Sequence, residues 1–121
     1  MTMPMPMIDE RRRGQRVPVD FFVQVRLGER IALYPATDIS TSGIYLLASD
    51  DHGAIDPSEP LDLEFTLPSG ALVRTLAHVA YIDDRMGQRG LGALFAELDP
   101  DHLTSIDRFV AASNAARSRL D

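Results

Sequence analysis

The fold of this chain is decided by the stretch Leu61-Asp62-Leu63-Glu64-Phe65-Thr66-Leu67, in which apolar and polar residues alternate strictly. Successive side chains of a β-strand point to opposite faces, so this pattern places the leucines and the phenylalanine on one face. Pro68-Ser69-Gly70 follows directly and predicts a hairpin connection to a long β-forming segment over 72–82. The stretch therefore predicts a half-buried strand of an antiparallel sheet.

The same period of two recurs on both sides of this hairpin. Upstream, apolar residues alternate over 21–27 and stop at the turn Gly28-Glu29. Further strands are expected at 31–39, 44–47 and 90–95, separated by a turn at Ser40–Gly43, a loop over 52–60 and a polar turn over 83–88. About six antiparallel strands in so short a chain predict an all-β domain, built as a small barrel or sandwich.

The C-terminal part of the chain has a helical pattern instead. Asp99 can cap a helix N-terminus, with Pro100 at the first helical position and Asp101 in the positively polarised first turn. One face of this helix would hold four apolar side chains, those of Leu103, Ile106, Phe109 and Val110. After Ala116 the residues become polar, so we expect the helix to end there and residues 118–121 to fray.

Length and composition favour one domain without disulfides. The 121 residues fit a single domain, which we assign to 10–117, and they include no cysteine. The absence of cysteine fits a reducing, cytoplasmic location. No apolar run approaches the ~20 residues that span a bilayer, so membrane insertion is not expected. Met1–Met7 lacks the apolar core of a signal peptide, and residues 1–9 are expected to form a flexible tail.

Four arginines stand within six residues in Arg11-Arg12-Arg13-Gly14-Gln15-Arg16, here called the arginine arm. The chain has a net charge of −6 and the arm contributes +4, which leaves −10 for the remainder. Gly14 and Pro18 disfavour a helix, so we expect an extended arm that can bend at the glycine. A guanidinium group suits a phosphate or the O6 and N7 acceptors of guanine. This local concentration of positive charge favours one small anionic ligand over a long polyanion.

A second segment, Asp38-Ile39-Ser40-Thr41-Ser42-Gly43, comes at the end of the strand expected over 31–39. Asp38 and Ser40 are two residues apart, which places them on one face of an extended segment. The carboxylate can accept from N1–H and N2–H of guanine, and the serine hydroxyl can donate and accept. Gly43 permits a turn with positive φ or the close approach of a ligand. Together the two segments predict a guanine-nucleotide site without a catalytic group.

The pair of motifs Arg12-x-x-x-Arg16 and Asp38-x-Ser40-x-x-Gly43, in this order and spacing, resembles the PilZ domain, the bacterial receptor domain for cyclic di-GMP. Val79-Ala80-Tyr81 is similar to the end of the long strand of that family, and segment 90–95 is similar to its glycine-led last strand. The helix from Asp99 resembles the helix that closes the family fold. The resemblance covers residues 10–117.

The resemblance implies a six-stranded antiparallel β-barrel with a C-terminal α-helix and a mobile N-terminal arm. It implies that Arg12 and Arg16 grip phosphate and guanine, and that Asp38 and Ser40 contact the guanine base. Gly43 would shape the turn. The implied function is a non-catalytic receptor, without a cofactor, in which closure of the arm over cyclic di-GMP signals to a partner protein in trans. Motility, secretion and polysaccharide machinery are the kinds of partner that the family offers.

Three further residues are implied as ligand contacts. An arginine beside the first motif is common in members that bind a stacked ligand dimer, so Arg11 and Arg13 favour two cyclic di-GMP molecules per chain. Tyr81 stands where other members often have tryptophan, and its ring can stack on a base.

Other interpretations of the same residues remain open. The arginine arm can be a solvated basic segment, Asp38–Gly43 a turn that caps its own backbone, and Tyr81 a barrel residue with an exposed hydroxyl. The domain can also be a PilZ-type adaptor that binds a partner protein without ligand. The −10 outside the arm opposes binding to nucleic acid or anionic lipid. The sequence contains neither a grouped set of metal ligands nor a catalytic motif.

Overall fold

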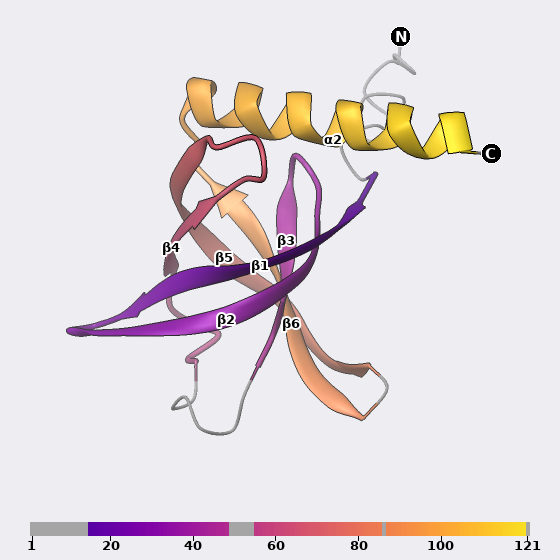
Figure 1. The fold of residues 1–121 in the computed structure, drawn as a ribbon. Helices are drawn as coiled ribbons and strands as arrows, with labels where there is room; N and C mark the ends of the chain where they lie inside the picture. Colours follow the sequence, from indigo (N-terminus) through magenta and orange to yellow (C-terminus); the bar gives the residue numbers. More distant parts are fainter. Residues whose placement is uncertain (1–14, 49–54, 86, 121) are drawn as a thin grey trace, which may run out of the picture.

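The computed structural model describes residues 15–48, 55–85 and 87–120. This part of the chain forms six strands and one helix, which are β1 (Val17–Leu27), β2 (Arg30–Ile39), β3 (Gly43–Leu47), β4 (Leu61–Thr66), β5 (Leu72–Arg85), β6 (Gln88–Ala96) and α2 (Pro100–Leu120). The strands pair antiparallel in the order β1-β2-β3-β6-β5-β4, and pairing of β1 with β4 closes the barrel (Figure 1). The predicted six-stranded antiparallel barrel with a C-terminal helix is confirmed, and the sandwich is excluded.

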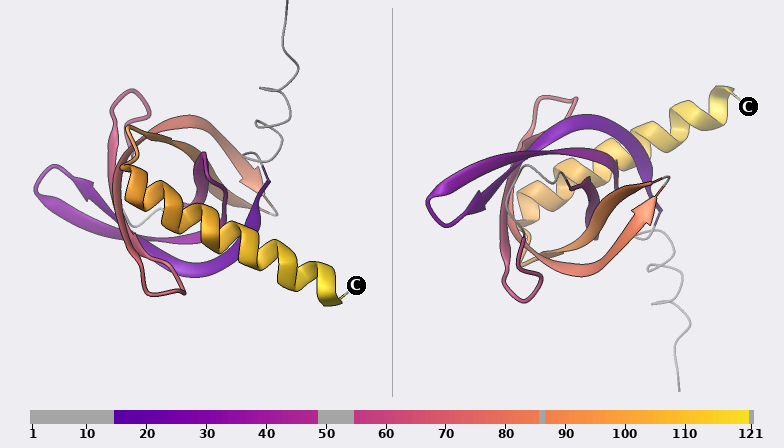
Figure 2. Two further views of the ribbon diagram at one scale, coloured as in Figure 1. Left: turned by 90° about the horizontal axis from the view of Figure 1, so that it is seen from above. Right: turned by 90° about the horizontal axis from the view of Figure 1, so that it is seen from below.

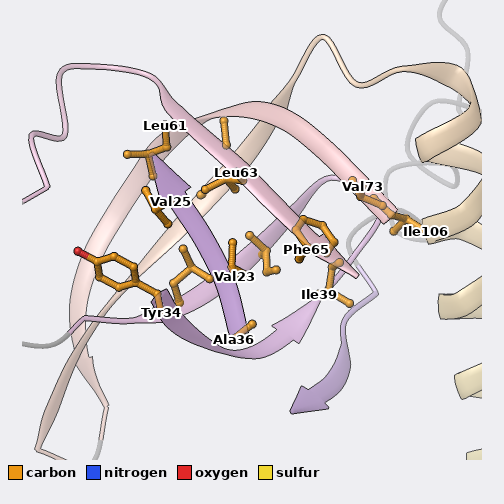
Figure 3. Packing of buried hydrophobic residues seen from close by; sticks show 14 of the residues in the cluster. Val23, Val25, Tyr34, Ala36, Ile39, Leu61, Leu63, Phe65, Val73 and Ile106 are labelled. Atoms are coloured by element: carbon orange, nitrogen blue, oxygen red, sulfur yellow. The ribbon is translucent and has the colours of Figure 1, made fainter. Parts of the chain in front are cut away.

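The strand that decides the fold is arranged as its alternation predicts. Leu61, Leu63, Phe65 and Leu67 are at most 3% exposed, whereas Asp62 and Glu64 between them are only partly buried. Figure 3 shows Leu63 and Phe65 inside the barrel together with Val23 of β1. Burial of each such side chain contributes about 1.5–3 kcal/mol, so this interior supplies much of the folding free energy.

The helix α2 lies across one end of the barrel (Figure 2). Asp99 caps it as predicted, because its Oδ1 accepts from the backbone N–H of Asp101 at 2.8 Å. On the predicted apolar face, Ile106 and Val110 are buried against the barrel and Phe109 is partly buried, whereas Leu103 is 42% exposed. The helix also continues past Ala116 to Leu120.

The connection between β5 and β6 is much shorter than the sequence pattern predicts. The polar turn expected over 83–88 is wrong, because β5 continues to Arg85 and β6 begins at Gln88. Asp83 and Arg85 are therefore strand residues, paired with Gly90 and Gln88 of β6. Tyr81 consequently lies within the long strand and not at its end.

Candidate ligand-binding site

Two register shifts turn key side chains to the outside of the barrel. On β2, Tyr34 and Ala36 are buried in the interior, and strict alternation would also point Asp38 inward. The ladder shifts between Ala36 and Asp38, so that Asp38 pairs with Tyr45 and Ile39 takes the interior position. A second shift, between Val79 and Tyr81 of β5, turns Tyr81 outward in the same way. β-bulges commonly redirect side chains next to functional sites.

The two shifts place Asp38 and Tyr81 in one row across four strands. Asp38 of β2 pairs with Tyr45 of β3, Tyr45 pairs with Gly92 of β6, and Gly92 pairs with Tyr81 of β5. A Cβ atom on Gly92 would lie 2.3 Å from the Tyr81 ring, and one on Gly90 would lie 2.3 Å from the Tyr45 hydroxyl. Because the glycines leave this space, the two rings stack with centroids 6.2 Å apart. We call these four residues, Tyr45, Tyr81, Gly90 and Gly92, the tyrosine–glycine patch.

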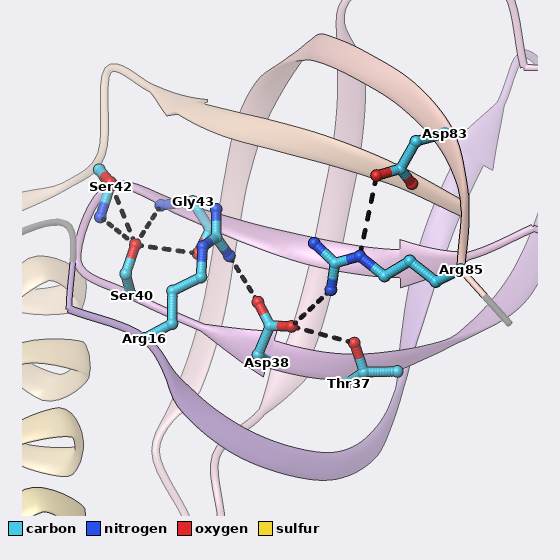
Figure 4. Close-up of polar contacts among 8 residues, drawn as sticks. All are labelled: Arg16, Thr37, Asp38, Ser40, Ser42, Gly43, Asp83 and Arg85. Atoms are coloured by element: carbon cyan, nitrogen blue, oxygen red, sulfur yellow. Dashed lines mark hydrogen bonds and ion pairs between the residues drawn. The ribbon is translucent and has the colours of Figure 1, made fainter. Parts of the chain in front are cut away.

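Asp38 lies between two arginines (Figure 4). It is at the edge of the tyrosine–glycine patch, because it pairs with Tyr45. Nη1 of Arg16, just before β1, is 2.7 Å from Oδ1 of Asp38, and Nη1 of Arg85 is 3.4 Å from Oδ2. The Thr37 hydroxyl donates to the same Oδ2 at 3.2 Å. The Asp38 side chain is 18% exposed and those of Arg16 and Arg85 are 31% and 45% exposed, so the three charges can be reached from solvent.

Arg85 covers the Tyr45 ring. Its Cζ lies 3.7 Å from the ring centroid, a cation–π contact, and Tyr45 is fully buried although it is not part of the barrel core. The Tyr45 hydroxyl donates to Oδ1 of Asp83, and Nε of Arg85 is 3.8 Å from Oδ2 of that carboxylate. Burial, followed by the hydrogen bond and negative charge of Asp83, raises the pKa of Tyr45 to about 12, although Arg85 acts in the opposite direction. Tyr45 is thus a neutral donor at physiological pH.

Ser40 has a different environment from Asp38. It is 1% exposed, and its Oγ accepts from the backbone N–H groups of Ser42 and Gly43, both at 3.2 Å. Its own N–H donates to the carbonyl of Gly43 at 2.8 Å, which closes the turn between β2 and β3. The Ser40 hydroxyl therefore stabilises the turn beside the two arginines and the aspartate (Figure 4).

The reason for glycine at position 43 is contact with a neighbouring strand. The residues with positive φ in the described ranges do not include Gly43, so that part of the prediction is wrong. A Cβ atom at this position would lie 2.4 Å from the carbonyl oxygen of Ala93 on β6. Only glycine lets the β3 and β6 backbones come this close, and the turn is positioned by that contact.

The structure brings Arg16, Asp38 and Tyr81 to one region of the barrel surface, with the turn formed by Ser40 and Gly43 beside it. Three other predicted residues, Arg11, Arg12 and Arg13, lie outside the described residues.

Sequence reasoning missed Tyr45, Asp83 and Arg85 as members of this region. A signal for the last two was present, since Tyr81, Asp83 and Arg85 repeat at intervals of two along the chain. Tyr81 and Asp83 pair with Gly92 and Gly90 of β6, and Arg85 pairs with Gln88. The interpretation of 83–88 as a turn hid that signal.

Fold and site together define a small β-barrel domain with a charged candidate site, backed by aromatic rings, on its outside. The chain belongs to the PilZ domain family, whose model matches residues 10–112. The resemblance expected from the two motifs is thus confirmed at the level of the family.

Solved structures show the same fold at low sequence identity. An inhibitor of motility from Bacillus subtilis, MotI/DgrA, is 19% identical with a TM-score of 0.76 over 84% of this chain and 50% of its own. YcgR from Escherichia coli in complex with c-di-GMP is 19% identical, with a TM-score of 0.74 over 92% and 50%. The PilZ domain of YcgR with c-di-GMP is 18% identical, with a TM-score of 0.73 over 92% and 98%. The chain thus spans about half the length of the first two proteins.

A sequence comparison with curated proteins finds no significant match. Across residues 15–48, 55–85 and 87–120, no helix combines the length and apolar character needed to cross a membrane. In the same ranges, no three acidic or histidine side chains are grouped so that they could hold a metal ion.

Proposed function

We propose that this chain is a non-catalytic receptor that binds cyclic di-GMP on the outer surface of the barrel. The observation that carries the proposal is Asp38, which a register shift turns outward between Arg16 and Arg85 beside the tyrosine–glycine patch. Membership of the PilZ family and the c-di-GMP complexes of YcgR support the choice of ligand. The ligand lies between the arginine arm and the turn that Ser40 and Gly43 form.

The chemistry of guanine and phosphate matches these groups. The Asp38 carboxylate accepts from N1–H and N2–H of guanine, while Arg12 and Arg16 take phosphate and base. Binding then exchanges the ion pair between Arg16 and Asp38 for contacts of each residue with the ligand. Tyr81, which is 39% exposed, offers a ring for stacking on a base. Arg11 and Arg13 would serve a second, stacked cyclic di-GMP molecule.

The signal in this proposal is the closure of the arginine arm. The arm, the ligand and the outer face of the barrel form one new surface when the arm closes, and an effector protein recognises that surface in trans. Motility machinery is one candidate partner, because a structural neighbour is an inhibitor of motility. Secretion and polysaccharide machinery are further candidates.

Calorimetric titration with cyclic di-GMP tests the receptor proposal and gives affinity and stoichiometry together. We expect saturable binding, with cyclic di-AMP binding much more weakly. Arg16→Ala should lose about 1–3 kcal/mol of binding free energy, the scale of one bidentate contact. An Arg16→Ala protein with full affinity would refute the role of the arm. A stoichiometry of one ligand per chain would exclude the stacked dimer.

The second candidate function is a PilZ-type adaptor that binds a partner protein without ligand. A groove of about 680 Å³ between α2 and the turn at Thr41 and Ser42 favours it, since exposed Leu94 and Leu103 line this groove. Thermal unfolding with and without cyclic di-GMP separates the two functions. A receptor is stabilised by about 2.7 kcal/mol at a ligand concentration of 100 times its Kd, whereas an adaptor of this kind is not.

A further inference from the structure

Arg85 is held in place more firmly than an ordinary surface arginine. The Tyr45 ring supports one face of its guanidinium at 3.7 Å, and the carboxylates of Asp38 and Asp83 flank Nη1 and Nε. Its side chain is nevertheless 45% exposed. A guanidinium has five N–H donors, so donors remain for a further pair of acceptors.

A guanine base bound at Asp38 needs such donors. The carboxylate satisfies N1–H and N2–H but offers nothing to the O6 and N7 acceptors, and a polar group left unpaired in a contact is costly. O6 is next to N1–H on the base, so its partner must come from a group beside the Asp38 carboxylate. Among the residues that the structure describes, the arginines that contact this carboxylate are Arg16 and Arg85.

We infer that Arg85 recognises O6 and N7 of the guanine whose N1–H and N2–H bind Asp38, an inference that rests on the proposed function. Arg85 is the better of the two arginines for this task because it belongs to a barrel strand and its position is fixed by Tyr45 and Asp83. Arg16 precedes β1 at the base of the arginine arm and is suited to the phosphates. Recognition of a base edge depends on rigid placement, whereas charge attraction to a phosphate tolerates movement.

This assignment makes Arg85 a specificity-determining residue. Adenine carries an amino group where guanine carries O6, so its N–H donors would face the donors of Arg85. Such a contact rejects the wrong base by repulsion in addition to loss of a hydrogen bond. Asp38 and Arg85 together would therefore recognise the complete set of polar groups that distinguishes guanine from adenine.

The test compares cyclic di-GMP with its 7-deaza analogue, in which N7 is replaced by C–H, in calorimetric titrations of the whole chain. We expect the parent protein to bind the analogue about tenfold more weakly, the lower end of the range for a bidentate base contact. Arg85→Ala should bind cyclic di-GMP about tenfold more weakly and then show no further loss with the analogue. That non-additivity is the signature of a direct contact, which a purely structural role would not produce.

Two variants complete the experiment. Arg85→Lys keeps the positive charge over the Tyr45 ring but lacks the planar fork, so it should also fail to distinguish the two ligands, and it serves if Arg85→Ala does not fold. Arg74→Ala, an arginine of the same strand that pairs with Asp62, should discriminate as the parent does. Equal losses with the analogue in the parent and in either Arg85 variant would overturn the inference. Failure of the parent to bind cyclic di-GMP would instead refute the proposed function.

Discussion

Two aspartates on the outer surface of this barrel each lie between two arginines, but they differ in exposure and in the backbone and aromatic groups around them. Asp38 lies between Arg16 and Arg85, at 2.7 Å and 3.4 Å. Asp62 of β4 lies between Arg26 and Arg74, at 3.9 Å and 3.2 Å. The side chain of Asp62 is 30% exposed and that of Asp38 is 18% exposed. Each of these clusters of one aspartate and two arginines sums to one net positive charge, so the charge of these three groups alone cannot distinguish a binding site from a surface ion-pair group.

The backbone and the aromatic support make the difference. Asp62 sits in a regular ladder, paired with Arg26 on one side and with Leu76 on the other. Asp38 follows a register shift, and the tyrosine–glycine patch extends from it across three further strands. The patch supports Arg85 through the Tyr45 ring and presents the Tyr81 ring, which is 39% exposed. The comparison teaches that a β-bulge and two glycines turn an ordinary ion-pair group into a candidate site.

The largest expected difference between the two aspartates is in ligand binding. Asp38→Ala should lose about 3 kcal/mol of binding free energy for cyclic di-GMP, roughly a hundredfold in Kd, because hydrogen bonds to a charged acceptor are lost. Asp62→Ala removes the same charge from the other cluster and should bind as the parent does. Calorimetry on both variants measures this directly. Equal losses would mean that the overall charge of the barrel attracts the ligand and that Asp38 has no special role.

The next effect concerns the space that the glycines provide. Gly90→Ala should lower the free energy of unfolding by about 1–3 kcal/mol, since the added methyl group overlaps the Tyr45 hydroxyl, which Asp83 holds. Denaturant unfolding gives this value. Gly28→Ala is the matched control, because its Cβ would meet nothing within 4 Å and only the positive φ of 66° is costly, at about 1 kcal/mol. A smaller loss of unfolding free energy for Gly90→Ala than for Gly28→Ala would show that the Tyr45 ring moves aside at little cost.

The strands and two of the site residues could be predicted from the sequence, whereas the register shift that distinguishes Asp38 from Asp62 could not. The strands were predictable because every strand must place apolar residues in one interior, as the 61–67 stretch does. Arg16 and Asp38 were identified by motif and spacing. The register shifts were not predictable, because the alternation of Tyr34 and Ala36 would have sent Asp38 inward.

The contact between Arg85 and Asp38 could not be predicted from the sequence either. Arg85 is 47 positions from Asp38, and the barrel order brings the two together across β3 and β6. Gly90 and Gly92 on β6 leave space for the Tyr45 and Tyr81 rings, and this role can be recognised only once the strand order is known.

A third, smaller effect is a pH dependence of stability that comes from Tyr45, whose ring lies beneath Arg85 of the Asp38 cluster. The pKa of Tyr45 is raised from 10.0 to about 12 by burial and by Asp83. As the pH rises, the unfolded chain therefore loses the Tyr45 proton before the folded chain does. The stabilisation that comes from protonated Tyr45 is complete below pH 10 and is lost as the pH rises towards 12. The free energy of unfolding falls by at most about 1.4 kcal/mol per pH unit in this range. Denaturant unfolding at several alkaline pH values measures the slope.

Tyr45→Phe is the control for this slope. The variant should lose the part of the slope that comes from Tyr45 and keep any part due to Tyr34, whose pKa burial also raises. An unchanged slope in Tyr45→Phe would show that the hydroxyl of Tyr45 is not protected by Asp83.

The smallest expected effect belongs to the Asp62 cluster itself. Arg74 donates to Asp62 from Nε at 3.4 Å and from Nη2 at 3.2 Å, but both side chains are exposed to solvent and salt. Exposed ion pairs of this kind contribute little, because water screens the charges and two long side chains must be ordered. Asp62→Asn should therefore leave the unfolding midpoint unchanged within error, at low and at moderate salt, and should leave cyclic di-GMP binding intact. A clear loss of stability that salt suppresses would show that the arginines of β1 and β5 repel each other once Asp62 is neutral. Asp62 would then stabilise the fold by keeping Arg26 of β1 and Arg74 of β5 close together. The two aspartates would differ in role, with Asp62 serving stability and Asp38 serving ligand binding.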